Sequence, residues 1–350
     1  MMGSDATSPD TQAVLLLTAP LLVGRREEGV RPLNAREYQR VADHLLALQR
    51  RPGDLLRPEN DELRAQCATL KGVGDLDALL RRGMLLSQAL DRWATRGIWV
   101  VSRADEAYPH RLIASLGTAA PPILYGIGDL ALLSRPALGV VGSRKAPQAA
   151  LDTATEAGAA AARIGALLVS GDAKGVDRAA MGAAAEAGGV VVAVLADGLE
   201  RQALVPENRE AIHDGRLVLV SPHDPGVGRS IGLLMGRNKV MYGLSDAVLV
   251  ADTKYREGGT WNGAHEHLSK QRPGTVFIRT DRPTSEGQEA LLLLGGQVWP
   301  EAYNDDDLRS ILHGPAGTSE STEDSLPPEP EPEEESPAAP EQITMFPLET

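Results

Sequence analysis

Residues 139–177 constrain the fold of this chain more than any other stretch. An apolar run ends at Gly142, a long Ala-rich segment follows, and a second apolar run ends at Gly171. The pattern predicts a strand, a loop, a helix, a second strand and a second loop that opens another helix. In a parallel sheet both loops emerge at the carboxyl ends of neighbouring strands, where backbone N–H groups and helix N-termini converge on a crevice. We therefore expect the functional site there.

Both loops carry residue types that bind an anion. In the first loop Gly142 lets the backbone approach a ligand, Ser143 offers a hydroxyl group, and Arg144 supplies a planar guanidinium for bidentate phosphate contact. The second loop, residues 170–177, repeats this chemistry one strand further on. The loop residues that we expect to contact phosphate are Gly142, Ser143, Arg144, Lys145, Ser170, Gly171, Lys174 and Gly175.

Two acidic residues of the second loop have different expected roles. Asp177 is placed to hold the loop closed or to cap the following helix, and we favour this structural role over catalysis. Asp172 is harder to explain, because a carboxylate in an anion-binding turn repels the ligand.

Two further basic clusters follow, each at or near an expected helix start. One contains Arg209, and the other contains Arg237, Asn238 and Lys239. Four basic clusters on one side of one sheet suit a groove that follows a nucleic-acid backbone. The dinucleotide-binding pattern Gly-x-Gly-x-x-Gly is not met, because no further glycines follow Gly142 at the required spacing. This disfavours a nicotinamide or flavin enzyme.

The flanking sequence predicts how these loops are supported. Before residue 98, apolar residues at helical spacing predict a small helical module, with a capping box formed by Asn34 and Glu37. Strands and helices then alternate, with about six strands, which predicts a mainly parallel sheet with helices on both faces. The Gly-rich segment 257–262 is predicted as a loop. The module contains two pairs of adjacent cations that we expect to face solvent: Arg50 with Arg51, and Arg81 with Arg82.

The net charge of −13 is mainly a property of the last 36 residues. Residues 315–350 hold 10 of the 48 acidic residues and no Lys or Arg, which leaves 38 acidic against 35 basic residues elsewhere. This segment is rich in Pro, Glu, Ser and Ala, and we expect it to be disordered.

The cysteine content and the hydropathy of the chain indicate the cellular compartment in which we expect it. The single cysteine, Cys67, cannot form an internal disulfide, and we expect it to be a small buried residue. No Cys and His cluster has metal-ligand spacing, so we expect neither a metal nor a cofactor. The apolar run at 13–23 is too short to span a membrane and lacks a basic start, so we expect a cytoplasmic protein.

The motifs at 142–145, 170–177, 206–209 and 237–247, in this order and spacing, resemble the DNA-processing protein family DprA, also called Smf. Tyr108, Pro109 and the segment 121–125 add to the resemblance, which covers roughly residues 105–252. It implies an extended Rossmann fold and a non-enzymatic protein that binds single-stranded DNA, forms a homodimer, protects incoming strands and helps to load a RecA-type recombinase. In the family this serves natural transformation, or competence, and DNA recombination.

The resemblance also assigns residue roles. It implies that Arg144, Lys174, Arg237 and Lys239 contact DNA phosphates, and that the pocket is shaped by Ser143, Gly171 and Asn238. The sequence departs from the family pattern at Asp172, where a neutral residue is expected, and at 258–262, where the usual turn is replaced. The acidic tail stands where many members carry a winged helix.

These departures keep an alternative open within the same superfamily. Nucleotide-binding sensors and phosphoribohydrolases, some of them in phage defence, share the signature Pro-Gly-Gly-x-Gly-Thr-x-x-Glu. Gly258, Gly259 and Thr260, followed by Glu266, repeat it in part. We expect Trp261 either to stack on a base or to pack in the interior. His265 and His267 are expected near the surface.

The end of the tail resembles peptides of the form Gln-Leu-x-Leu-Phe that dock on the bacterial sliding clamp. Its anchors are Gln342, Ile343, Met345 and Phe346. The alternative is a tail that aids solubility or competes with DNA for the basic pocket. The expected organisation is a helical module at 1–97, a Rossmann-like domain at 98–314 and a tail at 315–350.

Overall fold

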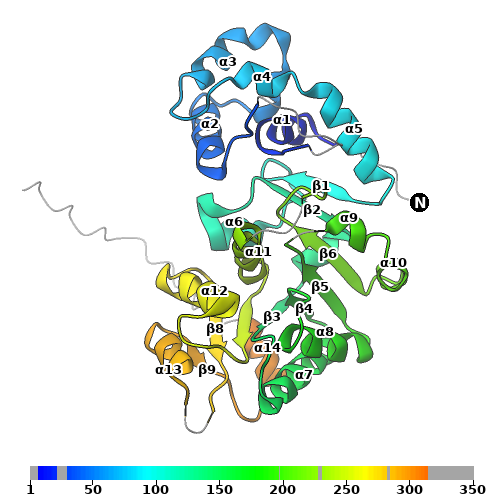
Figure 1. Ribbon diagram of the computed structural model, residues 1–350, viewed down its shortest axis with the longest axis vertical. Coiled ribbons are helices and arrows are strands. Elements are labelled where there is room, and N and C mark those ends of the chain that lie inside the picture. Colours follow the sequence, from blue (N-terminus) through cyan, green and yellow to red (C-terminus); the bar gives the residue numbers. More distant parts are fainter. Residues whose placement is uncertain (1–6, 22–29, 197, 228–230, 282–283, 314–350) are drawn as a thin grey trace, which may run out of the picture. The chain divides into compact units, whose positions relative to one another are not determined.

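The computed structural model describes residues 7–21, 30–196, 198–227, 231–281 and 284–313. The tail at 315–350, including the predicted clamp motif, lies outside them. Within the described residues nine strands form one sheet in the order β1-β2-β6-β5-β4-β3-β7-β8-β9 (Figure 1). The strands are β1 (Trp99–Ser102), β2 (Ile123–Ile127), β3 (Ala137–Val141), β4 (Leu167–Ser170), β5 (Val190–Val194), β6 (Leu217–Ser221), β7 (Ala247–Val250), β8 (Thr275–Ile278) and β9 (Gln297–Val298).

The sheet confirms the predicted α/β class and corrects the strand count. Seven neighbouring strands run parallel to one another: β6, β5, β4, β3, β7, β8 and β9. Strands β2 and β1 extend the sheet beyond β6 with antiparallel pairing. About six strands were expected, whereas nine are found among the described residues. The chain runs outward from β3 to β6 and returns to β7 on the other side of β3. The loops after β3 and β7 therefore diverge and leave a crevice at the carboxyl ends of these strands.

Helices cover both faces of the sheet, as predicted. One face carries α7 (Gln148–Arg163), α8 (Val176–Glu186) and α14 (Asp305–His313), which pack with Leu138 and Val140 (Figure 1). The opposite face carries α6 (His110–Leu116), α11 (Ile231–Gly243), α12 (Gly258–Ser269) and α13 (Glu286–Leu293), which pack with Val141. Successive strand residues point to opposite faces, so one apolar strand supplies both cores.

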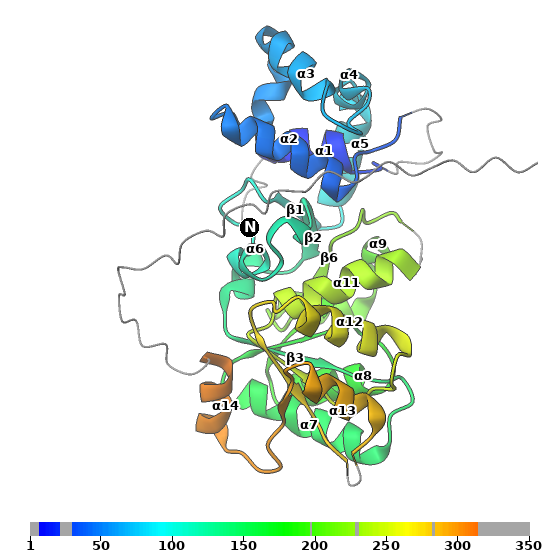
Figure 2. The same cartoon turned by 90° about the vertical axis from the view of Figure 1, so that its left-hand side faces the viewer.

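The helical module shares a hydrophobic core with the sheet (Figure 2). Its helices are α1 (Pro9–Thr18), α2 (Ala35–Ala47), α3 (Asp61–Ala68), α4 (Leu76–Leu80) and α5 (Gly83–Ala94), with the 3₁₀ turns η1 (Pro52–Leu56) and η2 (Pro58–Asn60). Tyr125 of β2 and Leu195 after β5 belong to the same core as α1. The remaining elements are η3 (Gly117–Ala119), η4 (Leu130–Ser134), α9 (Leu199–Gln202) and α10 (Pro206–His213).

The described part of the apolar run, residues 13–21, belongs to the core of the module. Helix α1 is buried over most of its surface, which explains why its apolar residues show no amphipathic spacing. No helix in the described segments is long and apolar enough to cross a membrane. The predicted capping box is confirmed, because Asn34 Oδ1 accepts from Glu37 N at 3.1 Å and Glu37 Oε2 accepts from Asn34 N at 2.8 Å.

Of the module's four paired cations, Arg50, Arg51 and Arg81 are exposed, as expected, whereas Arg82 is buried. Arg51 Nε donates to Asp10 Oδ2 at 2.6 Å, and Arg82 is buried and donates to the carbonyl oxygen of Leu16. A buried guanidinium needs such partners, because leaving its donors unsatisfied is costly. Cys67 is buried, as predicted.

Helices α7 and α8 pack closely at Gly158, where an added Cβ would lie 2.2 Å from the carbonyl oxygen of Ala180. We expect Gly158→Ala to lower the free energy of unfolding by about 1–3 kcal/mol, because the two helices would have to separate. Gly182 of α8 provides the matched control, since its Cβ would meet no atom within 4 Å. Gly182→Ala should raise the free energy of unfolding by about 0.5–1 kcal/mol. Urea denaturation measures both, and an unchanged Gly158→Ala variant contradicts the close packing.

Candidate functional site

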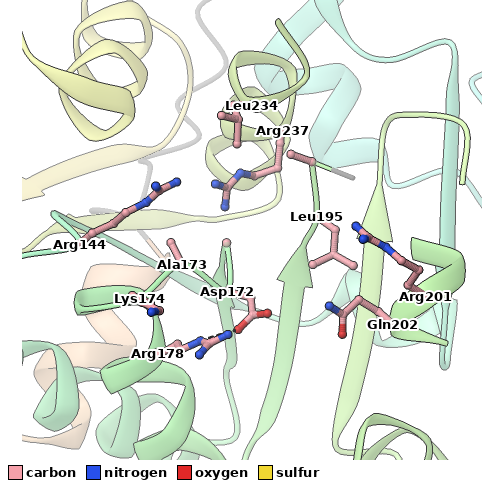
Figure 3. Close-up of a pocket in the computed structure, with 12 residues that line it drawn as sticks. Arg144, Asp172, Ala173, Lys174, Arg178, Leu195, Arg201, Gln202, Leu234 and Arg237 are labelled. Atoms are coloured by element: carbon pink, nitrogen blue, oxygen red, sulfur yellow. Dashed lines mark hydrogen bonds and ion pairs between the residues drawn. The ribbon is translucent and has the colours of Figure 1, made fainter. Parts of the chain in front are cut away.

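Two adjoining cavities open at the carboxyl ends of the parallel strands. One, of about 300 Å³, lies over β4 and β5, and the other, of about 580 Å³, lies between the loops after β3 and β7. They share the lining residues Arg144, Ala173, Leu234 and Arg237. We call the two together the anion cleft, and Figure 3 shows its β4–β5 half. The cleft therefore lies at the topological switch point of the sheet.

The anion cleft carries more positive than negative side chains. Its cations are Arg144, Lys145, Lys174, Arg178, Arg201, Arg237 and Lys254. Its carboxylates are Asp172, Asp177 and Glu257. Each of these three carboxylates lies within 4.0 Å of a cation of the cleft. The described lining residues thus include seven cations against three carboxylates, in a chain whose net charge is −13.

Arg237 reaches the cleft from the middle of α11, not from a helix start as predicted. Its side chain is 8% exposed, and its Nη1 lies 4.0 Å from Asp177 Oδ2. In Figure 3 the side chains of Arg237 and Arg144 point toward one another. An added Cβ at Gly171 would lie 1.3 Å from Arg237 Nη1, so only glycine leaves room for the guanidinium there.

Asp177 closes the loop after β4. Its Oδ2 accepts hydrogen bonds from the backbone N–H groups of Gly171 at 3.2 Å and Ala173 at 3.3 Å. Burial raises the pKa of Asp177 to about 6, although Arg237 and the backbone N–H donors act in the opposite direction. These contacts are those of a loop-holding residue.

The two predicted phosphate loops pack directly against each other. Gly175 has a φ of +83°, and an added Cβ there would lie 2.6 Å from Ser143 O and 2.8 Å from Arg144 O. Glycine can adopt this positive φ without strain, and its missing side chain leaves room for the two carbonyl oxygens. Gly142 likewise lies against Val176, whose side chain occupies the space of a Cβ. These glycines therefore bring the loops together and place Arg144 beside Lys174 at the rim.

Most of the predicted phosphate-binding residues line the cleft: Gly142, Ser143, Arg144, Lys145, Gly171, Lys174, Arg237 and Asn238. Four others do not, and the first of these is Gly175, which packs against the backbone of the loop after β3 instead. Ser170 is fully buried, and its hydroxyl group donates to Val140 O at 2.7 Å. Arg209 is exposed on α10, and Lys239 Nζ lies 3.1 Å from Glu266 Oε1 on the other side of α11. DNA contact by Arg209 and Lys239 stays a prediction.

Sequence reasoning missed Arg178, Arg201 and Lys254. Arg178 lies one helical turn after Lys174, and Arg201 and Lys254 follow the carboxyl ends of β5 and β7. The rule that ligands bind at the carboxyl ends of parallel strands applies to all three.

Arg178 explains the acidic residue in the second loop. Its Nε lies 3.2 Å from Asp172 Oδ1, so the carboxylate is paired inside the cleft (Figure 3). Asp172 has a φ of +54°, a conformation that Asp adopts more readily than most residues. The pairing reduces the repulsion that Asp172 exerts on a bound anion.

Contacts with the helical module hold α9, which forms the edge of the cleft after β5. Glu200 of α9 is 7% exposed and accepts from Arg92 Nε of α5 at 3.0 Å, with Arg96 Nε at 3.8 Å. The next two residues, Arg201 and Gln202, line the cleft. Helix α5 therefore helps to position this part of the rim.

The Gly-rich segment after β7 is the first turn of α12, not a loop. Asn238 Nδ2 donates to Gly259 O at 3.0 Å and ties this turn to α11. Glu266, the acidic residue of the partial hydrolase signature, does not line the cleft. It pairs with Lys239 and Lys270, whose hydrogen bonds lower the pKa of Glu266 although burial acts to raise it.

Two aromatic side chains of α12 are structural. Trp261 is 5% exposed and packs edge-on against Tyr255. The expectation that His267 lies near the surface is wrong, because its ring is 2% exposed and stacks on Tyr242, whereas His265 is exposed. Among the described residues no group of three or more His, Cys, Asp or Glu is placed to hold a metal ion.

The fold and the cleft together define a class: Rossmann-like proteins whose switch-point crevice is suited to an anion. Residues 99–305 match the family model of DNA recombination-mediator protein A, so the chain belongs to that family. This confirms the resemblance drawn from the motifs.

Relatives of known name agree with this assignment. The DNA processing protein DprA of Streptococcus pneumoniae is 34% identical over 158 residues, which are 44% of this chain and 54% of that protein. The Bacillus subtilis DNA processing protein DprA is 27% identical over 202 residues, 55% of this chain and 66% of that protein. The chain thus spans between about half and two thirds of the length of these curated relatives.

A solved structure shows the same fold. The X-ray structure of DNA processing protein A from Streptococcus pneumoniae superimposes with a TM-score of 0.63 at 22% identity. The match covers 80% of this chain and 94% of that chain.

The raised pKa of Asp177 predicts a pH-dependent stability. Its folded pKa of about 6 lies above the ordinary value of 3.8, so between these values the folded chain binds more protons than the unfolded chain. The stability contributed by this group is therefore fully present below about pH 4 and is lost as the pH rises through about 6. We expect the free energy of unfolding of the wild type, relative to Asp177→Asn, to fall across this window in urea titrations. A constant difference contradicts the raised pKa.

Proposed function

We propose that the chain binds single-stranded DNA in the anion cleft and acts as a non-enzymatic DNA-processing protein. The observation that carries the proposal is the gathering of seven cations and only three carboxylates among the described lining residues of the switch-point crevice, in a chain that is acidic overall. A local positive field of this kind attracts phosphates by counterion release, independently of base sequence. Membership of the DNA recombination-mediator protein A family supports DNA as the polymer.

The extent of the cleft favours a polymer over a single phosphate. Its lining residues follow the carboxyl ends of β5, β4, β3 and β7, which are adjacent in the sheet. Neighbouring strands lie about 4.8 Å apart, so the cations extend over roughly 14 Å. That length accommodates more than one phosphate group.

The concave form of the cleft favours one strand over two. A flexible single strand can bend its phosphates into a crevice, whereas a duplex is stiff, with a persistence length of about 50 nm. Aromatic residues are only 3% of the chain, so binding should depend mainly on phosphate contacts and therefore on salt.

The wider role follows from the family. We propose that the bound strand is protected and passed to a RecA-type recombinase during transformation or recombination, that the chain acts as a homodimer, and that it works in the cytoplasm. The clamp contact of Gln342, Ile343, Met345 and Phe346 stays a prediction. Each partner requires its own binding measurement.

The nucleotide-sensor or phosphoribohydrolase alternative rests on a single feature. The first turn of α12, with Gly258, Gly259 and Thr260, opens into the β3–β7 half of the cleft, and a helix N-terminus favours a phosphate. Glu266 lies outside the cleft, so this alternative lacks the carboxylate of its signature there.

A salt titration of DNA binding tests the proposed function. We expect single strands to bind more tightly than duplexes of the same length. Arg144→Ala and Lys174→Ala should weaken binding and reduce the slope of log K against log salt by about one each. Arg163→Ala, on the far end of α7 beside Asp305, is the matched control and should leave affinity and slope unchanged. Binding of a free nucleotide but of neither form of DNA would support the sensor alternative instead.

A further inference from the structure

A second groove adjoins the anion cleft, between α8 and α10. It has a volume of about 330 Å³. Its apolar lining residues are Met181, Ala185, Val191, Ala193, Leu195, Ala211, Leu217 and Leu219. We call it the α8–α10 groove. Its floor is formed by side chains of β5 and β6, and its size falls within the range of pockets that bind small ligands.

The groove is continuous with the anion cleft. The two share Asp172, Arg178, Leu195 and Gln202 as lining residues, and Figure 3 shows these four side chains together. The paired side chains of Asp172 and Arg178 therefore stand at the boundary between a cationic cavity and an apolar one. A ligand with a charged end and an apolar end could occupy both.

Two amide side chains, Gln202 and Asn208, line the groove on its α9–α10 side. Asn208 Nδ2 donates to Gln202 Oε1 at 2.8 Å and to Gln202 O at 3.2 Å, so the two amides are held in place. Amide groups offer both donors and acceptors, which the edges of all four bases require. The amide side of the groove is thus suited to the polar edge of a nucleobase, and the apolar floor is suited to the face of its ring.

We propose that the α8–α10 groove binds a nucleobase of the strand whose phosphate occupies the β4–β5 half of the anion cleft. This inference rests on the proposed function, because the strand delivers the base. A base is covalently tied to the phosphate beside it, so a nucleotide held by Arg144 and Lys174 brings its base within reach of the groove at a high effective concentration. The continuity of the two cavities favours a nucleotide over an apolar peptide, which would leave the cations unused.

The lining predicts the kind of recognition. None of the lining residues is aromatic, so the base contacts aliphatic side chains rather than a stacking partner. Base selectivity should then follow buried area, and purines should bind more tightly than pyrimidines.

A groove-filling variant tests the inference without touching the cations. Gly182 of α8 lines the groove, and an added Cβ would meet no atom within 4 Å, so Gly182→Leu should fill the groove and leave α8 in place. Gly83→Leu, at the start of α5, is the matched control, since a Cβ there also meets no atom within 4 Å. Urea denaturation of both variants establishes that they fold.

The readout is binding of a short deoxyadenosine oligomer compared with an abasic oligomer of the same length. We expect the wild type and Gly83→Leu to bind the deoxyadenosine oligomer about tenfold more tightly than the abasic one, because burying about 55 Å² of base surface against the aliphatic lining corresponds to such a factor. Gly182→Leu should lose most of this preference and still bind the abasic oligomer normally.

Three results overturn the inference. Salt-dependent binding of both oligomers with equal affinity would show that the groove takes no base and would leave the proposed function standing. A Gly182→Leu variant that folds and keeps the tenfold preference would place the base elsewhere. Failure of the wild type to bind either oligomer would overturn the proposed function together with the groove.

Discussion

The buried pair of Arg237 and Asp177 holds the two faces of the sheet in register at the cleft. Arg237 belongs to α11 on one face, Asp177 to α8 on the other, and the carboxylate also accepts from two backbone N–H groups of the loop after β4. Removing one partner of such a pair leaves a buried charge uncompensated, which typically costs about 3–5 kcal/mol. This contact requires glycine at position 171, because the Cβ of any larger residue would displace the guanidinium of Arg237.

The electrostatics of the cleft depend on this arrangement. Each acidic residue that lines it has a basic neighbour within the same cavity, so the carboxylates order the surrounding cations rather than cancelling the whole field. The other cations follow the carboxyl ends of three neighbouring strands, β3, β4 and β5. The positive field is therefore a product of the sheet order, which gathers these segments at one edge.

Local pattern was sufficient to predict the sheet class and the meeting of Arg144 with Lys174, because both follow apolar runs of the strand type. It was not sufficient where a residue's direction depends on packing. Lys239 was grouped with Arg237, but residues two apart on a helix point to different sides, and Lys239 meets Glu266 instead. Likewise, the burial of His267 results from the contact of α12 with Tyr242.

The contact of Glu200 with Arg92 gives the N-terminal helices a role in the site. These helices supply no lining residue to the anion cleft among the described residues, yet they share a core with the sheet and hold the segment that carries Arg201 and Gln202. Without the module, this turn after β5 would keep only nearer contacts, such as the hydrogen bonds between Asn208 and Gln202. The module thus acts as a brace for the cleft, and a substitution in α5 that removes the contact with Glu200 would loosen a rim to which α5 itself contributes no side chain.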